Sequence, residues 1–303
     1  MTDPTDLFRQ AIAAAGLTPP DEIIDDGKIH RFSSSDKPRV ESGWYVLHSD
    51  GVAAGAFGCW RAGFTQNWCG KSTTKMTQAE REAHQNRVQA MKAQRDSEQV
   101  QRNESAAVDA ASRFKAATAC TSHPYLTTKG VQAHGIRQEG DNLLIPMLDT
   151  ASTLHSLQTI TPDGDKRFIP GGRVKGCHFA IGAPDKVLIV AEGFATGATI
   201  KEATGAAVAV AFNAGNLGPV ALALPKKYPD LAIILAADDD WRTAGNPGLS
   251  SAKSAALAVG GFIVVPQFPA DRPAKATDFN DLAALAGLDA VRACFSEIAG
   301  LVC

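Results

Sequence analysis

The feature that most constrains the fold is a regular alternation of apolar runs and helix-forming segments over residues 183–303. The apolar runs are Val187–Ala191, 207–211, 231–237 and 261–265. Segments at 195–203, 217–224 and 248–259 lie between them and have the composition of helices. Strands that are apolar along their whole length are typical of a parallel sheet covered by helices on both faces. The alternation therefore predicts a parallel α/β domain at 183–303.

Acidic residues follow three of these predicted strands. Glu192 comes directly after the first strand, Asp238 and Asp240 follow the third, and Asp278 follows the fourth after a loop. Because the carboxyl ends of parallel strands meet at one edge of a sheet, we expect these carboxylates to lie close together. Grouped carboxylates repel one another unless a cation lies between them, and hard oxygen ligands suit Mg²⁺ or Mn²⁺. Taken singly, the same acids could cap turns and helices, but their order along the chain favours a metal site.

The rest of the chain divides into three stretches of different texture. Residues 1–75 combine glycines, aromatic residues and short strand patterns, which predicts a small β-rich module, a candidate for template binding. Residues 76–120 lack Gly and Pro and alternate charges of both signs, which predicts a long, solvated connector helix. Short strands return over 121–182, which we expect to form a mixed α/β subdomain before the α/β domain at 183–303.

A local cluster of basic residues precedes the α/β domain. Lys166, Arg167, Arg173 and Lys175 lie within ten positions and have no acid among them. We expect this cluster to face the acidic edge and to contact the phosphates of a template or a nucleotide. Lys129 and Arg137 would extend it, and the alternative is a solvated hairpin face.

Composition narrows the class of protein. A formal net charge of -2 excludes a chain that holds nucleic acid by bulk positive charge. No apolar run approaches the roughly 18 residues of a membrane span, and the start of the chain has no signal-peptide core, so no membrane partner is expected. The six cysteines are scattered without a CxxC pair, which indicates reduced thiols and a cytoplasmic location.

Other candidate sites are weaker. The potential zinc ligands His30, His48, Cys59 and Cys69 lack the close pairs of structural zinc sites, which argues against zinc. Four aromatic residues are candidates for stacking on single-stranded DNA, although core packing of a small module is the alternative: Trp44, Phe57, Trp60 and Trp68. For His123 and His178 we expect structural roles, and no P-loop motif is present.

These patterns carry a family resemblance. The strand Val187–Ala191 ends in Glu192-Gly193, a later strand ends in Asp238-Asp239-Asp240, and Asp278 follows downstream, an arrangement that resembles the Toprim domain of primases and topoisomerases. More closely, residues 123–281 resemble the Toprim-type primases of plasmids and phages, relatives of the bacterial replicative primase. The matching stretches are His123-Pro124-Tyr125-Leu126, Lys129-Gly130, Leu144-Ile145-Pro146-Met147, Leu157-Gln158-Thr159-Ile160, Asp163-Gly164-Asp165-Lys166-Arg167-Phe168, Gly176-Cys177-His178-Phe179 and Glu192-Gly193-Phe194-Ala195-Thr196.

The resemblance implies a role for each acid. Glu192 matches the family's acid/base or metal-linked glutamate, Asp238 and Asp240 match the pair that holds divalent metals, and Asp278 matches the downstream acid, with Asp281 a weaker candidate. Two departures stand out. Thr196 occupies a position where replicative primases often have Asp, and the segment 241–243 lengthens the loop before Ala-Gly.

The function that the resemblance implies is a DNA primase that makes short RNA primers in the presence of Mg²⁺ or Mn²⁺. Its partners would be single-stranded DNA, nucleoside triphosphates and a separate replicative helicase. A Toprim nuclease, which cuts phosphodiesters with the same acids, is one alternative. A non-catalytic DNA-binding accessory protein of replication or recombination is another, and Thr196 in place of an acid favours it.

Overall fold

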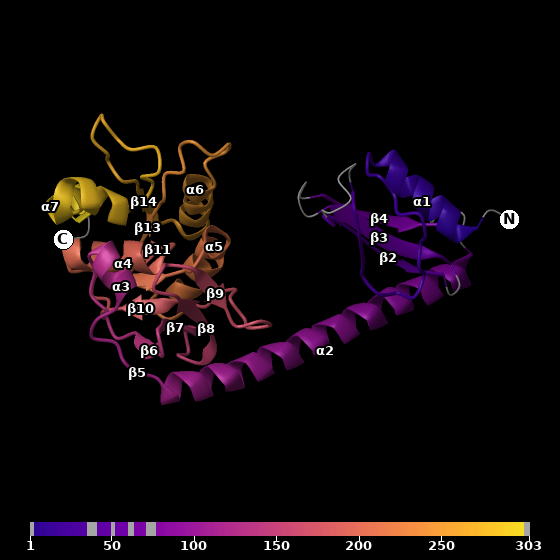
Figure 1. The fold of residues 1–303 in the computed structure, drawn as a ribbon, viewed down its shortest axis with the longest axis horizontal. Helices are drawn as coiled ribbons and strands as arrows, with labels where there is room; N and C mark the ends of the chain where they lie inside the picture. Colours follow the sequence, from indigo (N-terminus) through magenta and orange to yellow (C-terminus); the bar gives the residue numbers. More distant parts are fainter. Residues whose placement is uncertain (1–2, 35–40, 50–51, 60–63, 71–76, 300–303) are drawn as a thin grey trace. The chain divides into compact units, whose positions relative to one another are not determined.

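A computed structural model describes residues 3–34, 41–49, 52–59, 64–70 and 77–299 of the chain (Figure 1). The chain divides into two compact units, residues 1–96 and 97–303. The boundary between them falls within one long helix, α2 (Gln78–Ala116). The predicted connector at 76–120 is thus helical over most of its length.

The first unit is a four-stranded antiparallel sheet with one helix packed on it. The strands, in sheet order, are β1 (His30–Phe32), β2 (Gly43–His48), β3 (Ala54–Cys59) and β4 (Phe64–Cys69). Helix α1 (Pro4–Ala14) begins after Asp3, whose side chain accepts a hydrogen bond from the amide of Thr5, and has Pro at its first position.

Aromatic residues form the core of this unit. Phe8 and Ile12 lie one helical turn apart on α1, and both are fully buried. The ring of Phe8 packs edge-on against Tyr45, Phe57 and Trp68, with centroid distances of 6.0, 5.6 and 5.1 Å. Phe57 and Trp68 therefore serve the packing of the module, whereas Trp60 lies outside the described residues.

The second unit opens with an antiparallel sheet of five strands. In sheet order they are β5 (Thr118–Ala119), β6 (Arg137–Glu139), β7 (Asn142–Leu148), β8 (Leu154–Ile160) and β9 (Lys166–Phe168). The short helix α3 (Pro124–Lys129) lies between β5 and β6 in the chain. One face of the sheet packs on Ala106 and Ala110 in the last part of α2, so this part of the helix is not a free connector.

A second, mixed sheet forms the C-terminal layer. Its order is β10 (Phe179–Ile181), β12 (Ala207–Val210), β11 (Val187–Ala191), β13 (Ala232–Ala236) and β14 (Phe262–Val264). All neighbouring strands pair in parallel except β10, which runs antiparallel to β12. The predicted parallel α/β domain is confirmed, with an added antiparallel edge strand.

Helices cover both faces of this sheet, as its uniformly apolar strands require. The helices are α4 (Phe194–Thr204), α5 (Ala214–Ala223), the 3-10 turn η2 (Leu224–Lys226), α6 (Pro247–Val259) and α7 (Phe279–Ala299), the last of which is kinked at Gly287. Alternate strand residues pack on opposite helix layers: Ile189 belongs to a core with α4 and α7, and Leu188 to a core with α5 and α6. No helix among the described residues is long and apolar enough to span a bilayer.

Candidate active site

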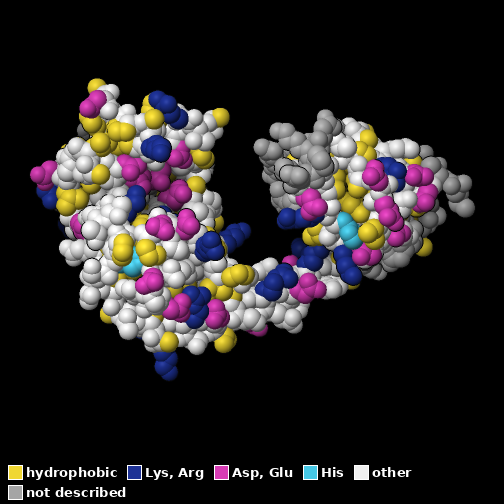
Figure 2. Space-filling model, viewed as in Figure 1, with side chains coloured by type: hydrophobic (Ala, Val, Ile, Leu, Met, Phe, Trp, Pro, Cys, Tyr) yellow, Lys and Arg dark blue, Asp and Glu magenta, His cyan; other side chains and the backbone are white. Residues whose placement is uncertain are grey.

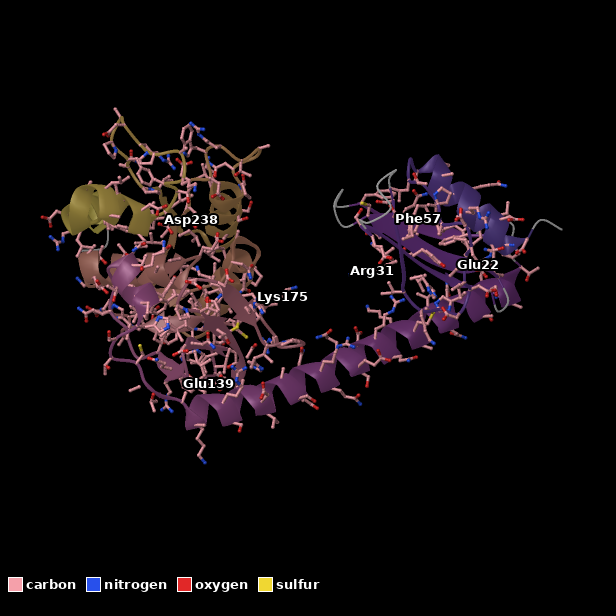
Figure 3. All side chains as sticks on the ribbon, viewed as in Figure 1. Glu22, Arg31, Phe57, Glu139, Lys175 and Asp238 are labelled. Atoms are coloured by element: carbon pink, nitrogen blue, oxygen red, sulfur yellow. The ribbon has the colours of Figure 1, made fainter. Side chains whose placement is uncertain are left out.

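The predicted acids lie at the carboxyl edge of the parallel sheet. Glu192 follows β11, Asp238 and Asp240 follow β13, and Asp278 directly precedes α7. Acidic side chains gather near the middle of the second unit's visible face in Figure 2, and Asp238 is labelled at this edge in Figure 3. The charges of Asp278, Glu192 and Asp240 all raise the pKa of Asp238, so the sheet brings the four predicted acids close together.

Of these acids, Asp238 is the one whose ionised form is most destabilised by its surroundings. Burial, and then repulsion from Asp278, Glu192 and Asp240, raises the pKa of its carboxyl well above the usual value. Its Oδ1 atom is buried and has no hydrogen-bond partner among the residues that the structure describes. Asp238 Cβ and Asp240 Oδ2 each lie 3.0 Å from the point that a Cβ at Gly248 would occupy, so at most twice that distance separates them. The edge therefore carries a carboxylate that the protein itself does not satisfy.

Glu192 shares this environment. Burial, and then the charge of Asp240, raises the pKa of Glu192, although the amide of Ala214 at the start of α5 donates a hydrogen bond to its carboxylate. A raised pKa in both Glu192 and Asp238 means that each site holds a proton more readily than a solvated acid, or accepts a cation in its place.

Asp278 both caps α7 and belongs to the acidic edge, two interpretations that the sequence left open. Its Oδ1 accepts a hydrogen bond from the amide of Asp281 (2.8 Å), and Asp281 Oδ2 accepts one from the amide of Thr277 (2.8 Å), a reciprocal cap at the start of α7. Its Oδ2 accepts a hydrogen bond from the Thr196 hydroxyl (2.9 Å). Thr196, which stands where relatives often have Asp, is thus a donor to the downstream acid. Burial, and then the charge of Asp281, raises the pKa of Asp278.

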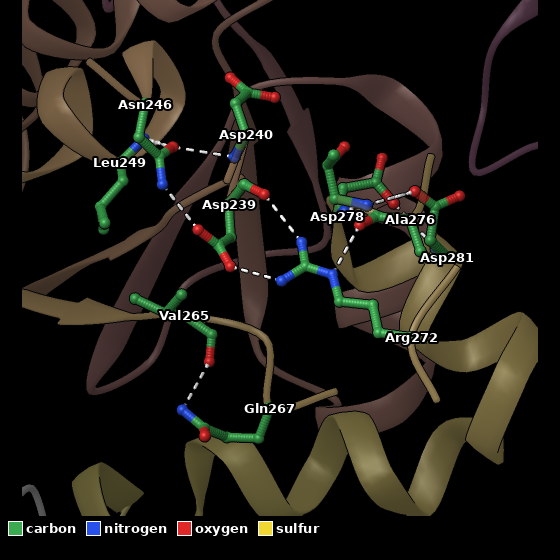
Figure 4. Close-up of polar contacts among 11 residues, drawn as sticks. Asp239, Asp240, Asn246, Leu249, Val265, Gln267, Arg272, Ala276, Asp278 and Asp281 are labelled. Carbon is green, nitrogen blue, oxygen red and sulfur yellow. Dashed lines mark hydrogen bonds and ion pairs between the residues drawn. The ribbon is translucent and has the colours of Figure 1, made fainter. Parts of the chain in front are cut away.

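The middle residue of the Asp-x-Asp segment is held by ion pairing (Figure 4). Arg272 donates to the carboxylate of Asp239 (2.6 Å), to its backbone carbonyl (2.8 Å) and to the carbonyl of Ala276 (2.8 Å). Asn246 adds a hydrogen bond to the Asp239 carboxylate (2.6 Å). Burial alone would raise the pKa of Asp239, but the bonds from Arg272 and Asn246 lower it below its usual value. Asp239 is therefore a structural anchor between two loops.

The lengthened loop after β13 has a defined path. The amide of Thr243 donates to the carbonyl of Asp240 (2.7 Å), which closes a turn with residues 241 and 242 at its tip. The side chain of Asn246 accepts from the amide of Asp240 (2.8 Å), and Asp240 Oδ2 accepts from the amide of Gly248 (3.0 Å). The inserted residues thus form a turn that folds back onto the start of α6.

Two of the predicted basic residues lie near enough to the acids to lower the pKa of at least one of them: Lys166 acts on Glu192 and Asp238, and Lys129 acts on Asp278. Lys166 Nζ lies 3.8 Å from the point where a Cβ at Gly193 would be, next to Glu192. Burial, together with the charge of Lys129, lowers the pKa of Lys166 against the opposing effects of Asp278, Glu192 and Asp238. The backbone carbonyl of Lys129 accepts a hydrogen bond from Asn280 (2.7 Å), which ties α3 to the start of α7.

The other predicted basic residues have different surroundings. Arg167 pairs with Thr159 and points to the opposite face of the sheet from Lys166, because side chains alternate along β9. Arg173 Nε donates to the carbonyl of Lys175 (3.2 Å), and the Lys175 side chain points outward at the surface (Figure 3). Arg137 donates to the carbonyl of Phe114 (2.8 Å) and stacks on its ring, so its contacts are with the end of α2.

A divalent cation fits the chemistry of this edge. Among the described residues, no three His, Cys, Asp or Glu side chains form a ready-made cage for a metal ion. Mg²⁺ does not need such a cage, because it is held by one or two carboxylates together with water and substrate phosphates. The unpartnered Oδ1 of Asp238, close to Asp240, is an oxygen ligand of this kind.

The two histidines outside this edge have structural surroundings. His123 caps α3 by accepting from the amide of Tyr125 (3.1 Å), and its Nε2 bonds to the carbonyl of Asp141 (2.8 Å). His178 is buried beside β7, and burial, followed by the charge of Lys227, lowers its pKa to about 4. Of the four zinc candidates, His30 pairs with Asp26 at 2.7 Å.

Three residues that position the site were not identified from the sequence: Arg272, Asn246 and Asn280. Asn280 lies between the two predicted acids Asp278 and Asp281 and also donates to Thr199 Oγ1 (2.9 Å) on α4. The local signal that the sequence offered is the expected start of a helix near Asp278, where the structure buries Asn280. Nothing in the sequence indicates that Arg272 lies against Asp239, since the partner is 33 residues away.

Comparison with known proteins agrees with this architecture. Residues 187–289 match the family described as the Toprim domain, so this part of the chain is a Toprim domain. Over most of its length the chain is homologous to DNA primase TraC of Escherichia coli. One TraC is 38% identical over 282 residues, covering 88% of this chain and 26% of the relative. Another is 34% identical over 301 residues, covering 93% and 20%. The chain thus spans about a quarter or less of the length of these relatives.

Among solved structures, the primase fragment of the bacteriophage T7 primase-helicase protein is similar with a TM-score of 0.44 and 17% identity. That similarity covers 60% of this chain and 76% of the T7 fragment.

Proposed function

We propose that the chain is a DNA primase that synthesises short RNA primers on single-stranded DNA by divalent-metal-dependent nucleotidyl transfer. The observation that carries the proposal is the group of carboxylates at the sheet edge, with the unpartnered Asp238 Oδ1 among them and Lys166 opposite. The homology to TraC supports the same function. Joining two nucleotides is an in-line phosphoryl transfer, for which a protein mainly has to position the reactants and neutralise charge.

The proposed roles follow from the surroundings of each residue. Asp238 and Asp240, with Glu192 and Asp278 beside them, would hold Mg²⁺ or Mn²⁺. When bound, the cation neutralises phosphate charge and lowers the barrier to displacement. Glu192 is suited to hold or accept a proton, because burial raises its pKa towards neutrality.

The basic residues would bind the substrates. Lys166, which faces the carboxylates, would pair with a triphosphate oxygen, and Lys129, near enough to affect the pKa of Lys166, would add its positive charge. Arg173 and Lys175 are exposed on the loop before β10 and would contact template phosphates. We assign Arg167 and Arg137 secondary roles in this surface. Arg167 points to the opposite face of the sheet from Lys166, and Arg137 contacts the end of α2.

The domain roles are part of the same proposal. Residues 1–75 would bind template, 76–120 connect, 121–182 supply the basic surface and 183–303 carry out catalysis. The partners would be single-stranded DNA, nucleoside triphosphates and a separate replicative helicase, in the cytoplasm.

A primer-synthesis assay tests the proposal. The substrates are single-stranded DNA of mixed sequence, labelled nucleoside triphosphates and Mg²⁺ or Mn²⁺. We expect Asp240→Ala to abolish the short labelled products, and Asp230→Ala to retain them. Asp230 is a matched control, because it is an exposed acid that precedes β13 at the opposite edge of the same sheet.

The products also separate the alternatives. Shortened template that depends on Asp240 would indicate a Toprim nuclease. Equal primer synthesis by wild type and Asp240→Ala would refute the assigned site. DNA binding by wild type without products in either strand would indicate a non-catalytic accessory protein.

A further inference from the structure

A large aromatic side chain is exposed beside the acidic edge. Trp241 follows Asp240 directly, and 44% of its surface is accessible to solvent. The acids and Arg272 account for the packing of the loop, and none of them requires an indole at this position. Exposed aromatic rings next to a site that handles nucleic acid are the means by which proteins stack on bases without sequence preference.

The loop that carries Trp241 is held in place from both ends. The Trp241 amide donates to the carbonyl of Asp239 (2.7 Å), and the turn closed by Thr243 and Asp240 puts residues 241 and 242 at its tip. Asp239 is fixed in turn by Arg272 from the neighbouring loop. The indole is therefore presented on an ordered turn, which reduces the entropy lost when a base stacks on it.

Two arginines surround the ring. The guanidinium carbon of Arg242 lies 4.6 Å from the centroid of Trp241, and that of Arg272 lies 5.3 Å from it. Arg272 donates to Asp239 and Ala276, so it is a fixed support for the ring. In the part of the chain that the structure describes, the Arg242 side chain makes only the contact with Trp241, and it is exposed. Its charge is free to pair with a phosphate.

We propose that Trp241 and Arg242 form a binding site for single-stranded DNA, with Trp241 stacking on a template base and Arg242 contacting the adjacent phosphate. The inference rests on the proposed function, because it identifies the strand as the template. An exposed ring at a turn tip suits a strand that passes over the surface, whereas a free nucleotide is bound in a concave pocket that buries most of it. The uncompensated positive charge of Arg242 matches a polyanion.

Binding of DNA without catalysis tests this site. Fluorescence anisotropy would follow a labelled oligodeoxynucleotide of mixed sequence, with EDTA and without nucleotides, over a range of salt concentrations. We expect Trp241→Ala to weaken binding on the order of tenfold. Trp241→Phe should stay close to wild type, because a phenyl ring still stacks. Arg242→Gln should lower the slope of log K against log salt by about 0.7, as expected for one phosphate contact to a single strand.

A matched control and a second signal exclude a merely structural effect. Leu257→Ala removes another exposed apolar side chain, 86% accessible, from the outer face of α6 in the same domain, and should bind like wild type. If Trp241 stacks on DNA, the strand should quench part of the wild-type tryptophan fluorescence, and that part should be missing in Trp241→Phe. Quenching of the same size in both proteins would contradict the site, even if Trp241→Ala were unstable.

The outcomes distinguish this inference from the proposed function. Primer synthesis by wild type, with unchanged DNA affinity in Trp241→Ala, would overturn the binding site and leave the primase intact. Loss of affinity in Trp241→Ala, with no primers from wild type, would support the site and refute the primase. If Trp241→Ala had an increased KM for nucleotide but unchanged DNA affinity, the ring would be assigned to nucleotide binding and the template site would be overturned. No DNA binding by wild type would also overturn it.

Discussion

Neutralising Asp238 should stabilise the cation-free protein while it destroys activity. Burial, and then repulsion from neighbouring carboxylates, raises the pKa of Asp238, so its ionised form is a source of instability at neutral pH. Asp238 Cβ lies no farther than about 6 Å from Asp240 Oδ2, and two unit charges at roughly that separation interact by about 3 kcal/mol at an effective dielectric of about 20. Lys166 offsets part of this repulsion. We therefore expect Asp238→Asn to raise the free energy of unfolding by about 1–3 kcal/mol in EDTA, or Tm by roughly 2–10 °C.

The pH dependence has a definite sign. A group with a raised folded-state pKa contributes stability below its unfolded pKa, here 3.8, and loses that contribution as pH rises through the folded-state value. The difference in Tm between Asp238→Asn and wild type should therefore be small near pH 4 and positive at pH 7–8. Mg²⁺ should raise the Tm of wild type by mass action and that of the variant much less.

The neighbouring aspartate is the control. Asp239 has a lowered pKa because of its bonds to Arg272 and Asn246, so Asp239→Asn should lower Tm at neutral pH. Thermal melts by circular dichroism in EDTA and in Mg²⁺ would measure both variants. Shifts of the same sign in the two, or a less stable Asp238→Asn in EDTA, would refute the electrostatic reasoning.

Two further predictions concern the residues around these acids. Lys166→Met should reduce primer synthesis by about a hundredfold, with Lys166→Arg retaining more activity, because a cation there faces the carboxylates and the proposed triphosphate; kinetics against nucleotide concentration measures this. Thr196→Val should cost about 1 kcal/mol in urea unfolding through loss of its bond to Asp278, and Thr196→Ser should restore it. Identical unfolding of Thr196→Val and wild type would show that this bond adds nothing.

The parallel sheet and its acidic edge could be predicted from local sequence. Strands such as Val187–Ala191 are apolar throughout, and that pattern indicates both their burial and the edge at which the following residue lies. The positions of the acids could thus be predicted from one general rule about parallel sheets. The strand boundaries differ from prediction by a residue or two, as at β12, which ends at Val210.

The contacts that complete the site are long-range and have no local pattern. The bond between Thr196 and Asp278 joins residues 82 apart, and that between Asn280 and Lys129 joins residues 151 apart. The separation of the basic cluster, in contrast, could have been predicted from local sequence. Lys166 and Arg167 are adjacent in sequence, but side chains alternate along a strand, so they point to different faces. The period of two was available in the sequence and predicts this separation.

The same repulsion that is expected to destabilise the cation-free fold would also favour the proposed binding of a cation at this edge. A proton and the proposed divalent cation would compete for the carboxylates whose pKa is raised, so we expect cation affinity to increase as pH rises and those protons leave. Asp239, held by Arg272, is excluded from this competition although it lies between Asp238 and Asp240. Pairing the middle residue anchors the loop, while the two flanking carboxylates remain available to the proposed cation, which in turn would neutralise a triphosphate.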